Sequence, residues 1–145
     1  MTRVKQLLDV KGNELVTVNP ESAVRDAIAK MAQKSAGTAL VMKDRKLAGI
    51  LSERDFIRKV YLKDKDGGAV KVSEIMSAEL ITVTPETSLE ECMSLMTEKR
   101  IRHLPVCAGD QVVGIISIGD IVKFTVQEKD FLIKNLQSYI AGFGL

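Results

Sequence analysis

Apolar and polar positions follow the same succession of patterns twice along this chain. The segments ELVTV at 14–18 and ELITV at 79–83 are β-branched runs followed by Pro20 and Pro85, which predicts a short strand in each. After each proline, apolar residues recur at i, i+3, i+4 and i+7, the spacing of a helix with one buried face. These residues are Val24, Ala27, Ile28 and Met31 in the first case, and Leu89, Cys92, Met93 and Met96 in the second.

Two further apolar runs follow each predicted helix and indicate a pair of buried strands joined by a polar turn. The first pair, TALVMK and LAGIL, surrounds residues 44–46, and the second pair, HLPVC and VVGII, surrounds residues 108–111. A second helix is predicted to begin at Ser52 and again at Ser117. Its apolar residues available for packing are Phe56, Ile57, Val60 and Tyr61, or Ile121, Val122 and Phe124.

The chain is an internal duplication. The segment VTVNPESAVRDAI from Val16 matches ITVTPETSLEECM from Ile81, 65 residues later, and the same shift relates Gly49 to Gly114. Ahead of each copy, VKQLL at 4–8 matches VSEIM at 72–76 with a shift of 68 residues. We therefore predict a mixed α+β chain with a first copy at 1–62, a polar linker at 63–71 and a second copy at 72–127. Helical spacing of Leu132, Leu136, Tyr139, Ile140 and Phe143 predicts an amphipathic C-terminal helix at 128–145.

Composition and charge exclude several classes of function. The net charge of +2 is too small to indicate nucleic-acid binding, and no apolar run approaches the length of a membrane span. We therefore expect no nucleic-acid or membrane partner and a cytoplasmic location. Cys92 and Cys107 lack ligand spacing and His103 is the single histidine, so no metal is expected. The sequence also lacks a nucleophile with a base or a phosphate-binding glycine loop, which argues against an enzyme.

Each copy places a serine and an aspartate three residues apart where an apolar strand meets a helix: Ser52 with Asp55, and Ser117 with Asp120. One interpretation is a capping box, in which the serine satisfies free amides and the aspartate reaches back. The other is a ligand site, in which the carboxylate accepts both hydroxyls of a ribose diol while the serine faces a phosphate or sugar oxygen. The residues alone leave both interpretations open.

The repeated order of strand, helix, strand, strand, helix, with h-x-[ST]-x-x-D after each third strand, resembles the cystathionine-β-synthase (CBS) domain pair, or Bateman module. RIRHLPV at 100–106 is similar to the second strand of that family, and the V-x-[DE]-I-M opening is similar to its lead-in helix. The resemblance covers residues 1–127. It implies a tandem β-α-β-β-α repeat with pseudo-two-fold symmetry, a disc-shaped homodimer, and clefts that bind adenosine compounds such as AMP, ADP, ATP, NAD or S-adenosylmethionine.

The resemblance also assigns residues to two composite clefts. The first would place Ile50, Ser52 and Asp55 opposite Leu80, Ile81, Arg102 and His103. The mirror cleft would place Ile115, Ser117 and Asp120 opposite Leu15, Val16, Thr38 and Ala39. Because the counterparts of Arg102 and His103 are Gly37 and Thr38, the first cleft is favoured for a phosphorylated ligand. The alternative for His103 is a strand-edge residue satisfied by backbone groups, and for Arg102 a solvated charge.

The expected function is that of a regulatory sensor, which binds an adenosine-containing ligand and acts through a regulated protein partner or through its own assembly. The alternative is a ligand-free homodimeric scaffold. A homodimer is expected because both copies place helix faces outside their sheets. The C-terminal helix is expected to bury Leu136, Ile140 and Phe143 against the module or against a second subunit, since leaving each wet forfeits roughly 1.5 to 3 kcal/mol.

Overall fold

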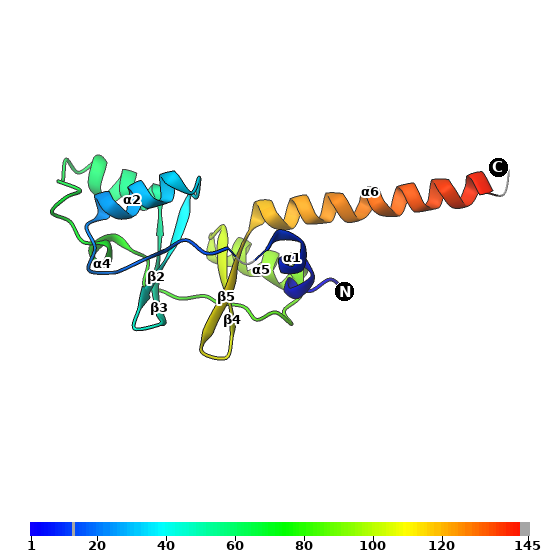
Figure 1. The fold of residues 1–145 in the computed structure, drawn as a ribbon, viewed down its shortest axis with the longest axis horizontal. Coiled ribbons are helices and arrows are strands. Elements are labelled where there is room, and N and C mark those ends of the chain that lie inside the picture. Colours follow the sequence, from blue (N-terminus) through cyan, green and yellow to red (C-terminus); the bar gives the residue numbers. More distant parts are fainter. Residues whose placement is uncertain (13, 143–145) are drawn as a thin grey trace.

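The computed structural model describes residues 1–12 and 14–142 and has a mixed helix and strand architecture (Figure 1). A lead-in helix, α1 (Val4–Lys11), precedes the first copy, and a shorter one, α4 (Val72–Ile75), precedes the second. The first copy comprises β1 (Thr17–Val18), α2 (Val24–Gln33), β2 (Thr38–Lys43), β3 (Lys46–Ser52), α3 (Glu53–Phe56) and a π-helical turn, η1 (Ile57–Tyr61). The second comprises α5 (Leu89–Lys99), β4 (His103–Ala108), β5 (Gln111–Ser117) and α6 (Ile118–Gly142). The order of elements confirms the predicted tandem α+β repeat.

Each copy builds a small sheet with the same register. In the first, β1 is parallel to β2 and β2 is antiparallel to β3; in the second, β4 and β5 form the antiparallel pair. Thr38 pairs with Ser52, and at the equivalent place His103 pairs with Ser117. The strands predicted at 14–18 and 79–83 were too long, because this edge segment has one neighbouring strand and a proline soon ends it. Ladder pairing is confined to Thr17–Val18 and to a single bridge at Val83.

Two hydrophobic cores form, one for each copy. Met31 of α2 and Met96 of α5 are buried in their respective cores, as predicted from the helical spacing. Met93 was also predicted to lie in the core, but its side chain is 37% exposed. It falls at the margin of the apolar face of α5, where the neighbouring Cys92 takes the buried position.

The lead-in helix of each copy packs on the other copy. Val4, Leu7 and Leu8 of α1 belong to the core that contains α5, β4 and β5, whereas α4 contributes Val72 and Ile75 to the core of the first copy. Equivalent backbone hydrogen bonds fix both crossings: the Val4 amide donates to Thr87 and the Val72 amide donates to Ser22, each at 2.9 Å. Packing therefore joins residues 4–11 to the second copy, although the sequence pattern groups them with the first.

Two equivalent glycines allow these helices to approach the sheets. A β-carbon at Gly49 would lie 2.7 Å from the Met76 sulfur and 2.7 Å from the backbone oxygen of Ser77. A β-carbon at Gly114 would lie 2.8 Å from a methyl group of Leu8. Leu8 and Met76 are themselves equivalent under the 68-residue shift, so each copy has a glycine where the crossing segment lies on its third strand.

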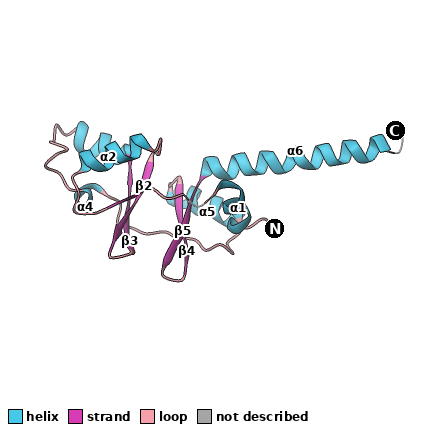
Figure 2. Cartoon of the chain, viewed as in Figure 1, coloured by secondary structure: helices cyan, strands magenta, loops and turns pink. Residues whose placement is uncertain are grey.

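The last helix differs most from the prediction. The expected boundary at 127–128 falls inside the continuous α6, which projects well beyond the body of the molecule (Figure 2). Every residue from 126 to 142 is exposed, including Leu136 and Ile140, so these two are not buried against the module. Their burial against a second subunit, the other arrangement predicted, stays a prediction. Phe143 lies outside the described residues. Three further residues predicted to pack are exposed on the surface, namely Ile57, Tyr61 and Val122.

Candidate functional site

The first strand-to-helix junction is a complete capping box. Ser52 ends β3 in an extended conformation, and its Oγ accepts a hydrogen bond from the Asp55 amide at 3.1 Å. In return, Oδ2 of Asp55 accepts from the Ser52 amide at 2.9 Å and from the Ser52 hydroxyl at 3.0 Å. The second carboxylate oxygen, Oδ1, lies 3.7 Å from Nζ of Lys59. Capping therefore uses one oxygen of Asp55 and leaves Oδ1 for other donors.

The second junction has the same cap and an additional cation. Oδ2 of Asp120 accepts from the Ser117 amide at 2.8 Å, and the Asp120 amide donates to Ser117 Oγ at 3.0 Å. Nζ of Lys11, at the end of the crossing helix α1, lies 2.6 Å from the same Oδ2 and donates to the Ile115 carbonyl at 2.6 Å. The carboxylate at this junction is therefore already paired with an ammonium group from the far end of the chain.

Electrostatics differ correspondingly around the two junctions. Burial raises the pKa of Asp120, but the Lys11 and Ser117 hydrogen bonds and the Lys11 charge outweigh burial and hold that pKa below its usual value. Burial lowers the pKa of His103, the Asp120 charge raises it, and the charges of Lys11 and Arg102 lower it further, so the net direction is downward. The lowered pKa favours the neutral imidazole at pH 7. In that form it can donate or accept a hydrogen bond at the junction.

Symmetry-equivalent residues meet between the copies. Thr38 Oγ1 lies 3.4 Å from both ring nitrogens of His103, although the two residues are 65 positions apart. Each begins the second strand of its copy and pairs across the sheet with the capping serine of that copy. The contact therefore brings the polar ends of both strand pairs together, as a composite site between the copies requires.

The other predicted cleft residues occupy varied environments. In the first predicted cleft, both backbone groups of Ile50 are hydrogen-bonded to Ser77, at 3.0 and 2.9 Å. Leu80 and Arg102 are exposed, and Ile81 packs partly against the second core. In the mirror cleft, Leu15 and Val16 are half-buried, whereas Ala39 is fully buried in the first core, which leaves only its backbone for a ligand.

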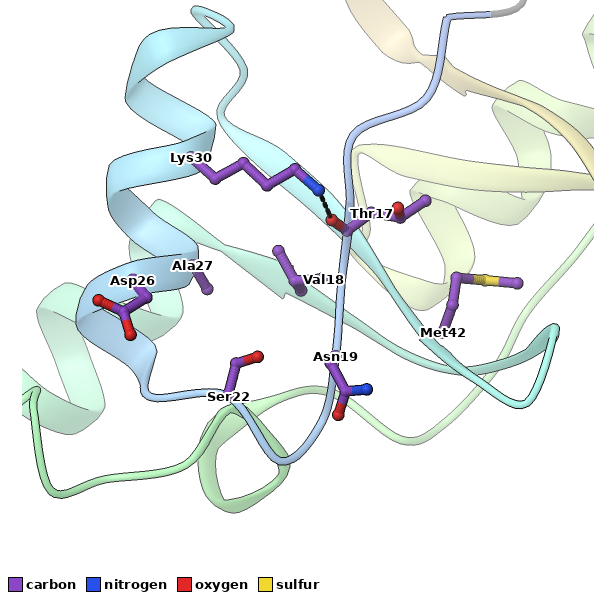
Figure 3. A pocket seen from close by; sticks show the side chains of 8 residues that line it. All are labelled: Thr17, Val18, Asn19, Ser22, Asp26, Ala27, Lys30 and Met42. Carbon is purple, nitrogen blue, oxygen red and sulfur yellow. Dashed lines mark hydrogen bonds between the residues drawn. The ribbon is translucent and has the colours of Figure 1, made fainter.

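A separate depression of about 430 Å³ lies on the first copy, where α2 faces β1 (Figure 3). Lys30 and Asp26 line it from α2, and the Lys30 ammonium donates to the Thr17 carbonyl. None of the residues assigned to the two clefts lines this depression. We therefore place the candidate site at the capped junctions and the Thr38–His103 contact, where the polar groups converge.

Sequence reasoning missed three groups that contact these junctions: Lys11, Lys59 and Ser77. The i, i+4 spacing of Asp55 and Lys59, within the helix predicted to begin at Ser52, was an available signal for that ion pair. Lys11 and Ser77 lie on the segments that cross between the copies, and no local pattern indicates such a crossing. Among residues 1–12 and 14–142, no group of three or more metal-ligating side chains is assembled, and no helix is long and apolar enough to cross a membrane.

The fold and its two junctions define a class of protein: a tandem α+β repeat whose copies exchange lead-in helices and present paired Ser/Asp caps at their common boundary. The CBS domain family matches residues 7–62 and 72–126, which together make up most of the chain. The chain therefore belongs to the CBS domain family and carries two tandem CBS motifs, as the sequence resemblance predicted.

Relatives of this class align over most of the chain. The mitochondrial CBS domain-containing protein CBSX3 of Arabidopsis thaliana is 41% identical over 127 residues, covering 84% of this chain and 62% of that protein. YhcV, a CBS domain-containing protein of Bacillus subtilis, is 34% identical over 78% of this chain and 80% of its own length. The crystal structure of the CBS domain protein NE2398 superposes with a TM-score of 0.82 at 46% identity, covering 86% of this chain and 98% of that one.

Two enzymes also align, but over a minor part of their own length. The match covers 34% of arabinose 5-phosphate isomerase KdsD of Yersinia pestis and 22% of inosine-5'-monophosphate dehydrogenase of Korarchaeum cryptofilum. The aligned parts correspond to 77% and 74% of this chain, so about three quarters of the chain match about a third or less of each enzyme.

Proposed function

We propose that this protein is a regulatory sensor that binds an adenosine-containing ligand, AMP, ADP, ATP or NAD, between its two CBS motifs. CBS pairs are generally regulatory, ligand-binding modules. The observation that carries the proposal is the first junction, where capping uses Oδ2 of Asp55 and leaves Oδ1 for another donor. A carboxylate in that position can accept hydrogen bonds from a ribose diol without dismantling the helix cap.

Asp55 is the better diol acceptor of the two junction carboxylates. At both junctions the cap uses Oδ2, but Lys11 also lies 2.6 Å from Oδ2 of Asp120, so the charge of that carboxylate is already closely paired before a ligand binds. Lys59 is 3.7 Å from Asp55, and its side chain is the more exposed of the two lysines. In this proposal Ile50 and Ile81 flank the adenine, exposed Arg102 meets phosphate charge, and neutral His103 contributes a hydrogen bond.

The output of the sensor is proposed to be non-catalytic, with a second copy of the chain and a regulated protein partner as its targets. No metal-ligating group of three side chains is found among the described residues. The alternative remains a scaffold whose clefts hold no ligand. Cytoplasmic localisation remains a prediction from sequence.

Isothermal titration with AMP, ADP, ATP, NAD and S-adenosylmethionine tests the proposal. The wild type is compared with Asp55→Asn, Asp120→Asn and the exposed turn variant Asp110→Asn as a matched control. Asp55→Asn should weaken binding of the best ligand roughly tenfold or more, since a hydrogen bond to a charged group contributes about 1.5 to 3 kcal/mol. Asp120→Asn should have a smaller effect, and Asp110→Asn should have none.

Three outcomes would contradict this assignment in different ways. Absence of heat for every compound with the wild type would favour the scaffold. Equal affinities for the wild type and Asp55→Asn would mean that Asp55 only caps the helix and does not bind the ligand. A loss confined to Asp120→Asn would move the ligand to the second junction.

A further inference from the structure

The projecting part of α6 carries apolar residues at a seven-residue spacing. Val126, Ile133 and Ile140 are seven residues apart, and Val122 and Leu136 each lie four residues before one of them, at the offset of the second apolar position of a heptad. In coiled-coil notation the first set occupies a positions and the second set occupies d positions, with Lys129 at the intervening d. The exposed fractions of the a residues are 52, 52 and 46%, so this seam is open along its whole length.

Exposing such a row of apolar side chains to water is unfavourable for a single helix. Residues 126–142 are all exposed, and most of the stability of helices in proteins comes from packing an apolar face rather than from helix propensity. Within the chain, the body cannot cover the seam, because α6 points away from it (Figure 1). The seam therefore calls for a partner outside the chain.

We propose that the seam is covered by α6 of a second copy of this chain, in a parallel two-stranded coiled coil. The a residues support this occupant: Val126, Ile133 and Ile140 are all β-branched, and β-branched residues at a, combined with leucine at d as at Leu136, favour two parallel strands. Lys129 occupies the d position between them and should lower the stability of the pair, because two ammonium groups would face each other across the seam. The inference uses no feature of the ligand clefts, so it stands or falls independently of the proposed sensor function.

Sedimentation analysis of the full chain over a range of concentrations tests the pairing. Leu136→Asp places a carboxylate in the seam and should weaken the self-association constant by roughly tenfold or more, because the charge must be desolvated. Phe131→Asp is the matched control, since Phe131 is 70% exposed on the opposite face of the same helix. It should leave self-association unchanged. A monomeric wild type, or equal effects of the two variants, would overturn the proposal.

Cross-linking tests the direction of the pairing. In a parallel, in-register pair, residue 136 of one helix faces residue 136 of the other, so Leu136→Cys should form an intersubunit disulfide under mild oxidation. Phe131→Cys and the wild type, with its native cysteines alone, should not. Lys129→Leu should tighten self-association, because two ammonium groups no longer face each other. Failure of Leu136→Cys to cross-link above the controls, or weaker association of Lys129→Leu, would refute the parallel seam.

Discussion

Replacing Lys11 by methionine should destabilise the protein through a residue more than a hundred positions away. The substitution keeps the aliphatic stem but removes the ammonium group that bonds Asp120 Oδ2 and the Ile115 carbonyl, both at 2.6 Å. Hydrogen bonds to charged groups contribute about 1.5 to 3 kcal/mol, and fully exposed ion pairs about 0 to 1 kcal/mol. The Lys11 and Asp120 side chains are 33% and 25% exposed, so we expect a loss of about 1 kcal/mol.

The effect of Lys11→Met on stability should depend on pH, and the pKa of Asp120 sets the direction of that dependence. The folded-state pKa of Asp120 lies below its ordinary value because Lys11 and Ser117 outweigh burial. The stabilisation is therefore fully present above the unfolded pKa, near 3.9, and is lost as pH falls through the folded pKa. The difference in unfolding free energy between wild type and Lys11→Met should stay constant from about pH 7 to pH 5, and it should narrow below about pH 4.

Urea denaturation at several pH values measures the effect. Lys5→Met, an exposed position on the same helix, serves as the control and should change stability little at any pH. In an Asp120→Asn background, Lys11→Met should cost less than in the wild type, since the charged acceptor is gone. A loss that is equal at pH 7 and pH 3.5, or equal in both backgrounds, would refute the ion pair as its cause.

Two further predictions concern packing and thiol reactivity. Gly49→Ala should lower the free energy of unfolding by about 1 to 3 kcal/mol, because the new β-carbon meets backbone as well as a side chain. Gly37→Ala, whose β-carbon would have no neighbour within 3.8 Å, is the control, and equal urea midpoints for the two would contradict the close approach. Burial, with a smaller contribution from the Glu91 charge, raises the pKa of Cys92 to about 11, so a thiol reagent at pH 8 should modify Cys107 first. Faster labelling of Cys92 would contradict this order.

Much of the fold was predictable because the two copies share one sequence pattern, so an element predicted in one copy could be checked at the equivalent position of the other. The 65-residue shift that relates Ser52 to Ser117 also relates their cross-strand partners, Thr38 and His103, so each strand register could be checked against its copy. The capping interpretation was equally local, since two residues of one turn, three positions apart, decide it. Both cap geometries are present in the structure.

Features that depend on distant contacts could not be predicted in the same way. The contact of Lys11 with Asp120 arises because α1 crosses to the second copy, and no local periodicity encodes that crossing. The repeat shift also changes to 68 in the lead-in segments, where Lys11 is matched by Glu79, so the two junctions differ in charge there. By contrast, the length of α6 had a sequence signal: residues 121–141 contain no glycine or proline to end the helix.

The crossing of α1 and α4 makes the two copies a single cooperative unit. Each core takes part of its apolar surface from a segment on the other side of the linker, so neither half of the chain carries a complete set of core residues. Cutting the linker would not release two working halves. Each fragment would lack the helix that closes its core and would depend on the other fragment for it. Stabilising one core, for example by binding a ligand at its junction, should therefore also stabilise the other core, because unfolding of either copy removes a helix that packs on the other.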